Sequence, residues 1–231
     1  MKYIAVPLGM LLSAIYDFLG HYGYTIIVFT LIVRIVLFPL YANQVKHGAK
    51  MAEVQPKMQA LQKQYANDRE TLNLKMQELY REEKFNPLMG CLPMIIQLPI
   101  IWGLFSLLRD PTAFLPDAEM WIASHESFFW IPDLSQPDQW ILPILAGVST
   151  FFSFTMTQQQ QPTGDAGNQM APMMKMMRYF FPVMIVWMGR SFPAGLTVYW
   201  FVGTVVQIGQ TQILNVWKKR LIAKNKTDKK K

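Results

Sequence analysis

One arginine, Arg34, stands in an apolar segment that contains no other charge: residues 30–40 read TLIVRIVLFPL. A guanidinium keeps its positive charge at physiological pH, and an arginine at the centre of a membrane-spanning helix costs about 2.5–3.5 kcal/mol on insertion scales. A residue so costly at that position indicates a function, and the chemistry that it offers is the attraction of anionic groups. We therefore take Arg34 as the leading candidate for a functional side chain.

Carboxylates that could neutralise Arg34 are missing from the apolar segments. The fifteen acidic residues are Asp17, Asp165, Asp228, six residues between positions 53 and 83, and six between positions 110 and 138. A buried arginine in a membrane protein is usually paired with a carboxylate on a neighbouring helix. Arg34 must instead be satisfied by water, by neutral groups or by a visiting partner.

Neutral polar residues in the other apolar segments are candidates to line a hydrophilic recess around Arg34. Arg34 lies seven residues before Tyr41. That separation is about 10 Å along a helix, so a recess that reaches Arg34 opens most easily at the Tyr41 end. An ordinary hydrogen bond between helices is the alternative role of each polar residue. The candidates are Gln97, Ser106, Ser149, Thr150, Ser153, Thr204, Gln207 and Gln210.

Enzymatic chemistry finds little support in the residue types. Cys91 is the single cysteine, so an internal disulfide and a multi-cysteine metal site are excluded, and its apolar surroundings favour a small buried hydrophobe. His21, His47 and His125 are far apart, and none belongs to a metal-binding motif such as HExxH. The apolar segments hold no histidine or carboxylate that would activate a nucleophile. We expect a protein without enzymatic activity, cofactor or bound metal.

The composition indicates an all-α membrane protein. Apolar residues make up 52% of the chain and charged residues only 16%. A helix needs about 20 mostly apolar residues to cross a bilayer, and five segments approach that length. Prolines inside them are tolerated because neighbouring helices can satisfy the carbonyl groups that they free. The expected spans are residues 24–41, 87–108, 140–157, 174–190 (where Arg178 and Arg190 reach toward the two interfaces) and 192–217.

Lysine and arginine mark the cytoplasmic side of such a protein. Eight lie in the connection at 44–86 and eight more in the tail at 218–231, whereas the loop at 109–139 has Arg109 alone against six acids. We therefore expect an extracytoplasmic N-terminus, a cytoplasmic loop at 158–173 and a cytoplasmic C-terminus. The recess near Arg34 then opens toward the cytoplasm. The basic tail has three alternative roles: binding ribosomal RNA, binding anionic lipid, or setting the topology.

Two amphipathic elements accompany the spans. Residues 7–20 place apolar side chains on one helical face with Pro7 in the first turn, which predicts a helix in the outer membrane interface; an uncleaved signal-like segment is the alternative. Residues 44–86 carry two apolar stripes around a turn at Asn67–Asp68, which predicts a cytoplasmic helical hairpin, with a solvated connector as the alternative. The first helix has Leu8, Leu11, Leu12, Ile15, Phe18 and Leu19 on its apolar face; the hairpin has Met51, Val54, Met58, Leu61 and Tyr65 on one arm and Leu72, Met76 and Leu79 on the other.

Four motifs resemble the YidC/Oxa/Alb family of membrane protein insertases: FTLIVRIVLFPL at 29–40, VQPKMQALQKQY at 54–65, NPLMGCLPMIIQLPI at 86–100 and SFPAGLTVYW at 191–200. The resemblance covers nearly the whole chain in order. The chain resembles the compact Gram-positive type of YidC, which has no large extra-membrane domain, and it shows no lipobox cysteine near position 1. The resemblance implies five transmembrane helices around a hydrophilic groove, a cytoplasmic helical hairpin, and a groove arginine at the position of Arg34.

The resemblance also implies a function, which is the insertion and assisted folding of newly made membrane proteins. The charge of Arg34 would draw the hydrophilic tail of the substrate into the water-filled groove, and release into lipid would need no nucleotide. The alternative is a small transporter or channel with Arg34 as an intramembrane anion site. The expected groove residues are Arg34, Gln97, Ser149, Thr150, Ser153, Trp200 and Gln207.

The expected surroundings follow from the same resemblance. We expect a multi-pass protein of the bacterial plasma membrane that is active as a monomer. Nascent membrane proteins and the lipid bilayer are its expected partners. The ribosome, contacted through the basic tail and the hairpin, and the Sec translocon are candidate partners.

Overall fold

The computed structural model describes residues 2–84, 86, 92–109, 118–158 and 167–228, and over these residues the chain is built from helices, turns and one bridge between Phe128 and Ile131. The all-α fold expected from the composition is therefore confirmed. None of the helices in this part of the chain is both long enough and apolar enough to cross a membrane. The helices are α1 (Lys2–Leu19), α2 (Tyr22–Val36), α3 (Phe38–Gln64), α4 (Arg69–Glu82), α5 (Leu92–Arg109), α6 (Ala118–Ser124), α7 (Ile141–Gln158), α8 (Gly167–Gly189) and α9 (Ala194–Asp228).

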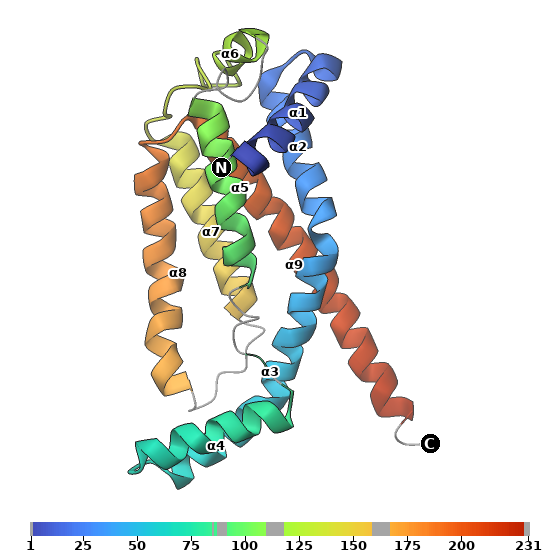
Figure 1. Cartoon of the computed structure of the whole chain (residues 1–231), viewed down its shortest axis with the longest axis vertical. Helices are drawn as coiled ribbons and strands as arrows, with labels where there is room; N and C mark the ends of the chain where they lie inside the picture. The colour runs from blue at the N-terminus through green and yellow to red at the C-terminus, as the bar shows by residue number, and fades with distance from the viewer. Residues whose placement is uncertain (1, 85, 87–91, 110–117, 159–166, 229–231) are drawn as a thin grey trace.

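Helix α9 is the centre of the bundle. It packs against α2 on one side and against α7 on the other, while α7 also packs against α8 and α1 covers α2 and α5. Figure 1 shows α2 and α9 crossing, with the α3–α4 hairpin at the end of the bundle opposite α6. The main apolar core lies where α1, α2, α5 and α9 meet the loop after α6. Its largest fully buried side chains include Leu12, Tyr22, Phe29, Leu107 and Leu134.

Helix α1 is longer than the sequence predicts. It begins at Lys2, so Pro7 lies inside the helix and the expectation of Pro7 in the first turn is wrong. Ala5, three residues before Leu8, is fully buried and extends the buried face of the helix toward the N-terminus. Phe18, which was expected on that face, is 88% exposed. The helix ends where Gly20 takes a φ of +65°, a left-handed conformation that favours glycine.

The span expected at 24–41 is divided between two helices. Helix α2 ends at Val36 and α3 begins at Phe38, with Pro39 in its first turn. Proline has no N–H group, so the carbonyl of Ile35 loses its usual helical donor, and the helix breaks there. Helix α3 then continues without interruption to Gln64. The first arm of the hairpin is therefore the same helix as the end of the expected first span.

The hairpin has a small apolar core of its own. Val54 and Met58 of α3 are buried against Leu79 of α4. Asp68 caps α4, because its Oδ1 accepts a hydrogen bond from the Thr71 N–H at 3.0 Å. The turn therefore falls at residues 65–68, and the apolar stripes of the two arms face each other.

Helices α8 and α9 continue past the ends of the expected spans. Helix α8 begins at Gly167, seven residues before 174, and α9 runs to Asp228, well into the segment expected to be a tail. Helical backbone hydrogen bonds form in water as well as in lipid, so the end of an apolar run does not have to end a helix. The guanidinium groups of Arg178 and Arg190 lie over aromatic rings, Phe151 at 5.2 Å and Trp140 at 4.1 Å respectively.

Candidate functional site

Arg34 lies in the last turn of α2, and its side chain is directed onto α9. The Nη1 group donates a hydrogen bond to the Oε1 atom of Gln207 at 3.4 Å. A Cβ atom placed on Gly203, one turn before Gln207, would lie 3.0 Å from Nη2 and 3.3 Å from Nε of Arg34. The guanidinium therefore occupies space that is available because residue 203 has no side chain.

The backbone of Arg34 is also held by α9. The last carbonyl groups of a helix lack intrahelical donors, and the Nε2 group of Gln210 donates to the Arg34 carbonyl at 3.2 Å. Gly203, Gln207 and Gln210 follow one another at helical spacing along one face of α9. Next to Gln210, the hydroxyl group of Thr211 lies 2.5 Å from the hydroxyl group of Tyr41 and joins the start of α3 to α9.

The charge of Arg34 is not neutralised by an acidic side chain in the part of the chain that the structure describes. Ion pairs in that part of the chain join His21 to Glu126, Lys57 to Glu83 and Lys75 to Glu78, all away from Arg34. The guanidinium of Arg34 donates instead to a neutral amide oxygen, that of Gln207. The arrangement matches the absence of carboxylates from the apolar segments of the sequence, and it leaves a positive charge that can attract an anion.

The α7–α9 interface brings together a second pair of candidate groove residues. Trp200 Nε1 donates to the Thr150 hydroxyl at 3.0 Å. Trp200 and Gln207 are both on α9, but Trp200 contacts α7 whereas Gln207 contacts α2. The candidate residues thus form two pairs about two turns apart along α9, Arg34 with Gln207 and Thr150 with Trp200.

The remaining candidates have local partners or lie outside the described side chains. The Ser149 hydroxyl donates to the Ala146 carbonyl at 2.9 Å, and the Thr204 hydroxyl donates to the Trp200 carbonyl at 2.7 Å. The Thr150 hydroxyl also donates to the Ala146 carbonyl, at 2.6 Å, and differs from these two in that it accepts the hydrogen bond from Trp200 on a neighbouring helix. Ser153 is buried on α7. Gln97 falls on α5, but its side chain is outside the described part of the structure.

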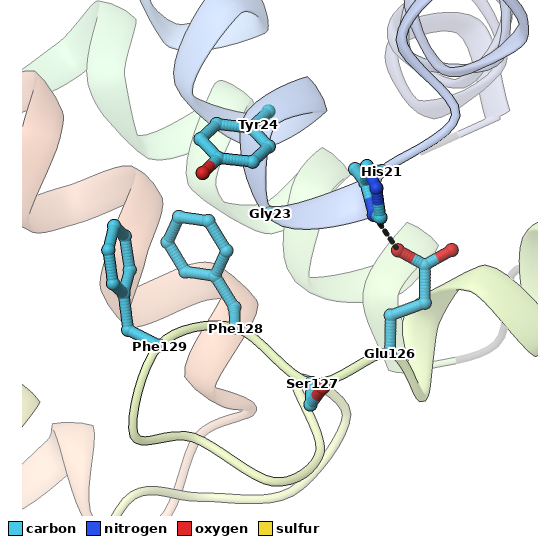
Figure 2. Close-up of a pocket in the computed structure, with 7 residues that line it drawn as sticks. All are labelled: His21, Gly23, Tyr24, Glu126, Ser127, Phe128 and Phe129. Carbon is cyan, nitrogen blue, oxygen red and sulfur yellow. Dashed lines mark ion pairs between the residues drawn. The ribbon is translucent and has the colours of Figure 1, made fainter.

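The loop expected at 109–139 holds a pocket against the start of α2, shown in Figure 2. The Glu126 carboxylate accepts hydrogen bonds from the Tyr22 N–H at 2.7 Å and from the Tyr16 hydroxyl at 2.6 Å. The Phe128 ring lies over Gly23, where a Cβ atom would come within 2.1 Å of it. Glu126 thus caps α2 and joins it to α1, and we assign this pocket a structural role in docking the loop.

Sequence reasoning missed some of the residues that surround Arg34. Gly203 was not among the candidates, although a glycine inside a helical apolar run indicates a close approach of another group. The contact of Tyr41 with Thr211 and the capping of α2 by Glu126 carried no local signal, because each joins residues more than 100 positions apart.

The close approach of Arg34 to Gly203 predicts a difference between two glycines of α9. A Cβ atom placed on Gly209 would have no neighbouring atom within 4 Å, so Gly209 is a matched control on the same helix. Replacing Gly209 by alanine should stabilise the protein by up to about 1 kcal/mol, because alanine favours a helix. Gly203→Ala should lose that gain, because its methyl group displaces the Arg34 guanidinium.

Thermal unfolding in detergent measures both substitutions, in the parent and in an Arg34→Ala background. We expect Gly203→Ala and Gly209→Ala to change the stability by different amounts in the parent and by the same amount in the Arg34→Ala background. The interaction energy between positions 34 and 203 should be about 1 kcal/mol. If Gly203→Ala changed the stability equally in both backgrounds, Arg34 would not be in contact with Gly203.

The helical bundle, with its arginine held on α9, matches known proteins over most of its length. Residues 14–221 match the sequence profile of a family described as "60Kd inner membrane protein". A relative named "Membrane protein insertase YidC" from Caldanaerobacter subterraneus subsp. tengcongensis is 39% identical over 92% of this chain and 94% of its own length. A relative of the same name from Fusobacterium nucleatum is 36% identical over 88% of this chain and 90% of its own. This chain therefore belongs to the YidC family of membrane protein insertases.

Longer relatives and a solved structure agree with this assignment. The insertase YidC of Ectopseudomonas mendocina is 40% identical over 90% of this chain, which spans only 33% of that protein. A crystal structure described as an active YidC insertase with its first transmembrane domain resolved has a TM-score of 0.63 and 28% identity, over 91% of this chain and 46% of that one. The resemblance of the four sequence motifs is thus confirmed, and the relatives are insertases rather than enzymes. The family is one of bacterial inner membrane proteins.

Proposed function

We propose that this chain inserts newly made membrane proteins by drawing their hydrophilic tails toward Arg34. The observation that carries the proposal is the position of Arg34, a permanent charge in an apolar segment whose acceptor is the neutral amide of Gln207. In a recess of low dielectric such a charge attracts an acidic tail more strongly than it would in bulk water. The apolar helix of the substrate then moves into lipid by hydrophobic burial, for which no nucleotide is needed.

The proposed arrangement has five crossings of the bilayer. They are α2 with the first turn of α3, then α5, α7, α8 and α9, around a hydrophilic groove that opens to the cytoplasm. Helix α1 lies in the outer interface, and the α3–α4 hairpin lies in the cytoplasm. The surplus of lysine and arginine at 44–86 and 218–231 supports an extracytoplasmic N-terminus and a cytoplasmic C-terminus.

Apolar stripes on α7 and α8 support contact with lipid. Both helices expose large apolar side chains at positions i, i+4, i+7 and i+11, which form one face of a helix. Continuous exposed apolar faces mark contact with a membrane or a partner rather than with water. The stripe of α7 is Ile141, Leu145, Val148 and Phe152, and that of α8 is Met176, Phe180, Val183 and Trp187.

The proposed partners are nascent membrane proteins and the lipid bilayer, with the ribosome and the Sec translocon as further candidates and a monomer as the active form. The basic residues of the α9 extension support attraction to ribosomal RNA or anionic lipid. The names of the relatives do not favour the alternative of a small transporter or channel.

Reconstitution of the purified chain into sealed liposomes tests the function. A single-span substrate with a short N-terminal tail is added during its synthesis, and protease protection of the tail reports insertion. We expect more protected tail than in empty liposomes, without added nucleotide. Liposomes that take up small anions through the chain but protect no tail would instead support a transporter.

A further inference from the structure

The hydrogen bond between Arg34 and Gln207 is long. Its N···O distance of 3.4 Å exceeds the usual range of about 2.7–3.2 Å for such a bond. A neutral amide acceptor also binds a guanidinium less strongly than a carboxylate does, because charge-assisted hydrogen bonds are shorter and about twice as strong. Gln207 therefore orients the Arg34 side chain without holding it tightly.

Within the described part of the chain, the same contact leaves the charge of Arg34 without a carboxylate partner. Gln207 has nearly the size and shape of a glutamate but carries no charge. A glutamate at this position would bring a carboxylate to the guanidinium from within the chain, as a permanent partner at high effective concentration. The identity of residue 207 thus decides whether Arg34 is available to an anion from outside.

We propose that Gln207 is a specificity-determining residue of the insertase, whose amide oxygen holds the place beside Arg34 that a carboxylate of an acidic substrate tail takes during insertion. This inference rests on the proposed function, since it requires that Arg34 attract substrate tails. Gly203 supports it, because the absence of a side chain at residue 203 lets the guanidinium lie against α9 beside Gln207.

The test compares variants in the liposome insertion assay, with two substrates that differ only in an acidic or a neutral tail. Gln207→Glu supplies an internal carboxylate, and Gln207→Met removes the amide while keeping the size and the neutral charge. Gln212→Glu is the matched control, because Gln212 is an exposed residue of the same helix that contacts Met156 of α7 and not Arg34. The parent and Arg34→Ala are measured alongside.

We expect Gln207→Glu to lower insertion of the acidic-tailed substrate about tenfold, to the level of Arg34→Ala, which corresponds to about 1.4 kcal/mol. Insertion of the neutral-tailed substrate should change little, and the thermal stability of the variant should not fall. Gln207→Met should keep most insertion of the acidic-tailed substrate, since Arg34 stays charged and unpaired. Gln212→Glu should behave as the parent, and Gln207→Glu should add nothing in an Arg34→Ala background.

Two results would overturn the inference about Gln207 and leave the proposed function unaffected. One is full insertion of the acidic-tailed substrate by Gln207→Glu while Arg34→Ala is defective; the other is an equal loss by Gln207→Met and Gln207→Glu. A parent that inserts neither substrate would overturn the proposed function itself, and the inference with it.

Discussion

Arg34→Ala should lower insertion of acidic-tailed substrates about tenfold. A tenfold loss corresponds to about 1.4 kcal/mol, which is only part of the roughly 4 kcal/mol that a charge pair about 4 Å apart contributes at an effective dielectric near 20. Substrates with neutral tails should lose much less. Arg34→Lys should keep much of the activity, since the positive charge remains even though lysine cannot reproduce the planar fork of the guanidinium. Arg34→Glu should be the most defective variant with acidic tails, because it repels them.

The folded protein should not suffer from the loss of Arg34. Removing a charge that costs about 2.5–3.5 kcal/mol at the centre of a span should leave the expression and thermal stability of Arg34→Ala at least equal to those of the parent. The hydrogen bond to Gln207 is too long to reverse that balance.

The measurement crosses arginine, lysine, alanine and glutamate at position 34 with a series of substrate tails of increasing acidity. The loss of insertion caused by replacing Arg34 should grow with each acidic residue added to the substrate tail. This trend should end where moving the tail charges across the membrane limits insertion. An equal loss for acidic and neutral tails would rule out charge attraction and leave Arg34 as a structural or hydrating residue.

Deletion of the α3–α4 hairpin should leave a folded membrane protein that inserts poorly. The apolar core of the hairpin, Val54, Met58 and Leu79, is separate from the main core, so the bundle loses none of its own packing when residues 46–84 are replaced by a short flexible linker. The loss of insertion follows if the hairpin receives substrates before they reach Arg34. Size-exclusion chromatography, thermal unfolding and the insertion assay measure the two effects separately.

The uninterrupted helix from Phe38 to Gln64 allows a second variant that isolates how the hairpin acts. Two glycines inserted after Asn43 should keep the hairpin intact but break its helical connection to the Arg34 region. We expect an intermediate loss of insertion if the hairpin acts through this rigid connection. Full activity of the hairpin deletion would reduce the segment to a connector between α3 and α5.

The helical elements, the isolation of Arg34 from carboxylates and the family could all be predicted from the sequence. These properties are local or compositional. The apolar stripes repeat at the period of a helix, the turn at Asn67–Asp68 has its own capping residue, and a missing acidic residue is visible without any coordinates. Element ends were less well predicted, as at Pro7 and in the extension of α9, because hydropathy marks the edge of an apolar run and not the edge of a helix.

Which polar residues contact one another depends on how the helices pack, and this could not be predicted from the sequence. Arg34 contacts Gln207 and Gln210 because α2 packs against α9 beside Gly203, where a missing side chain leaves room for the guanidinium. The packing of α7 against α9 distinguishes Thr150 from Ser149 in the same way. The Thr150 hydroxyl accepts a hydrogen bond from Trp200, whereas the Ser149 hydroxyl bonds to the Ala146 carbonyl of its own helix. Contacts between residues more than 100 positions apart depend on how helices cross and rotate, and those angles arise from the packing of whole helix faces, which no local pattern records.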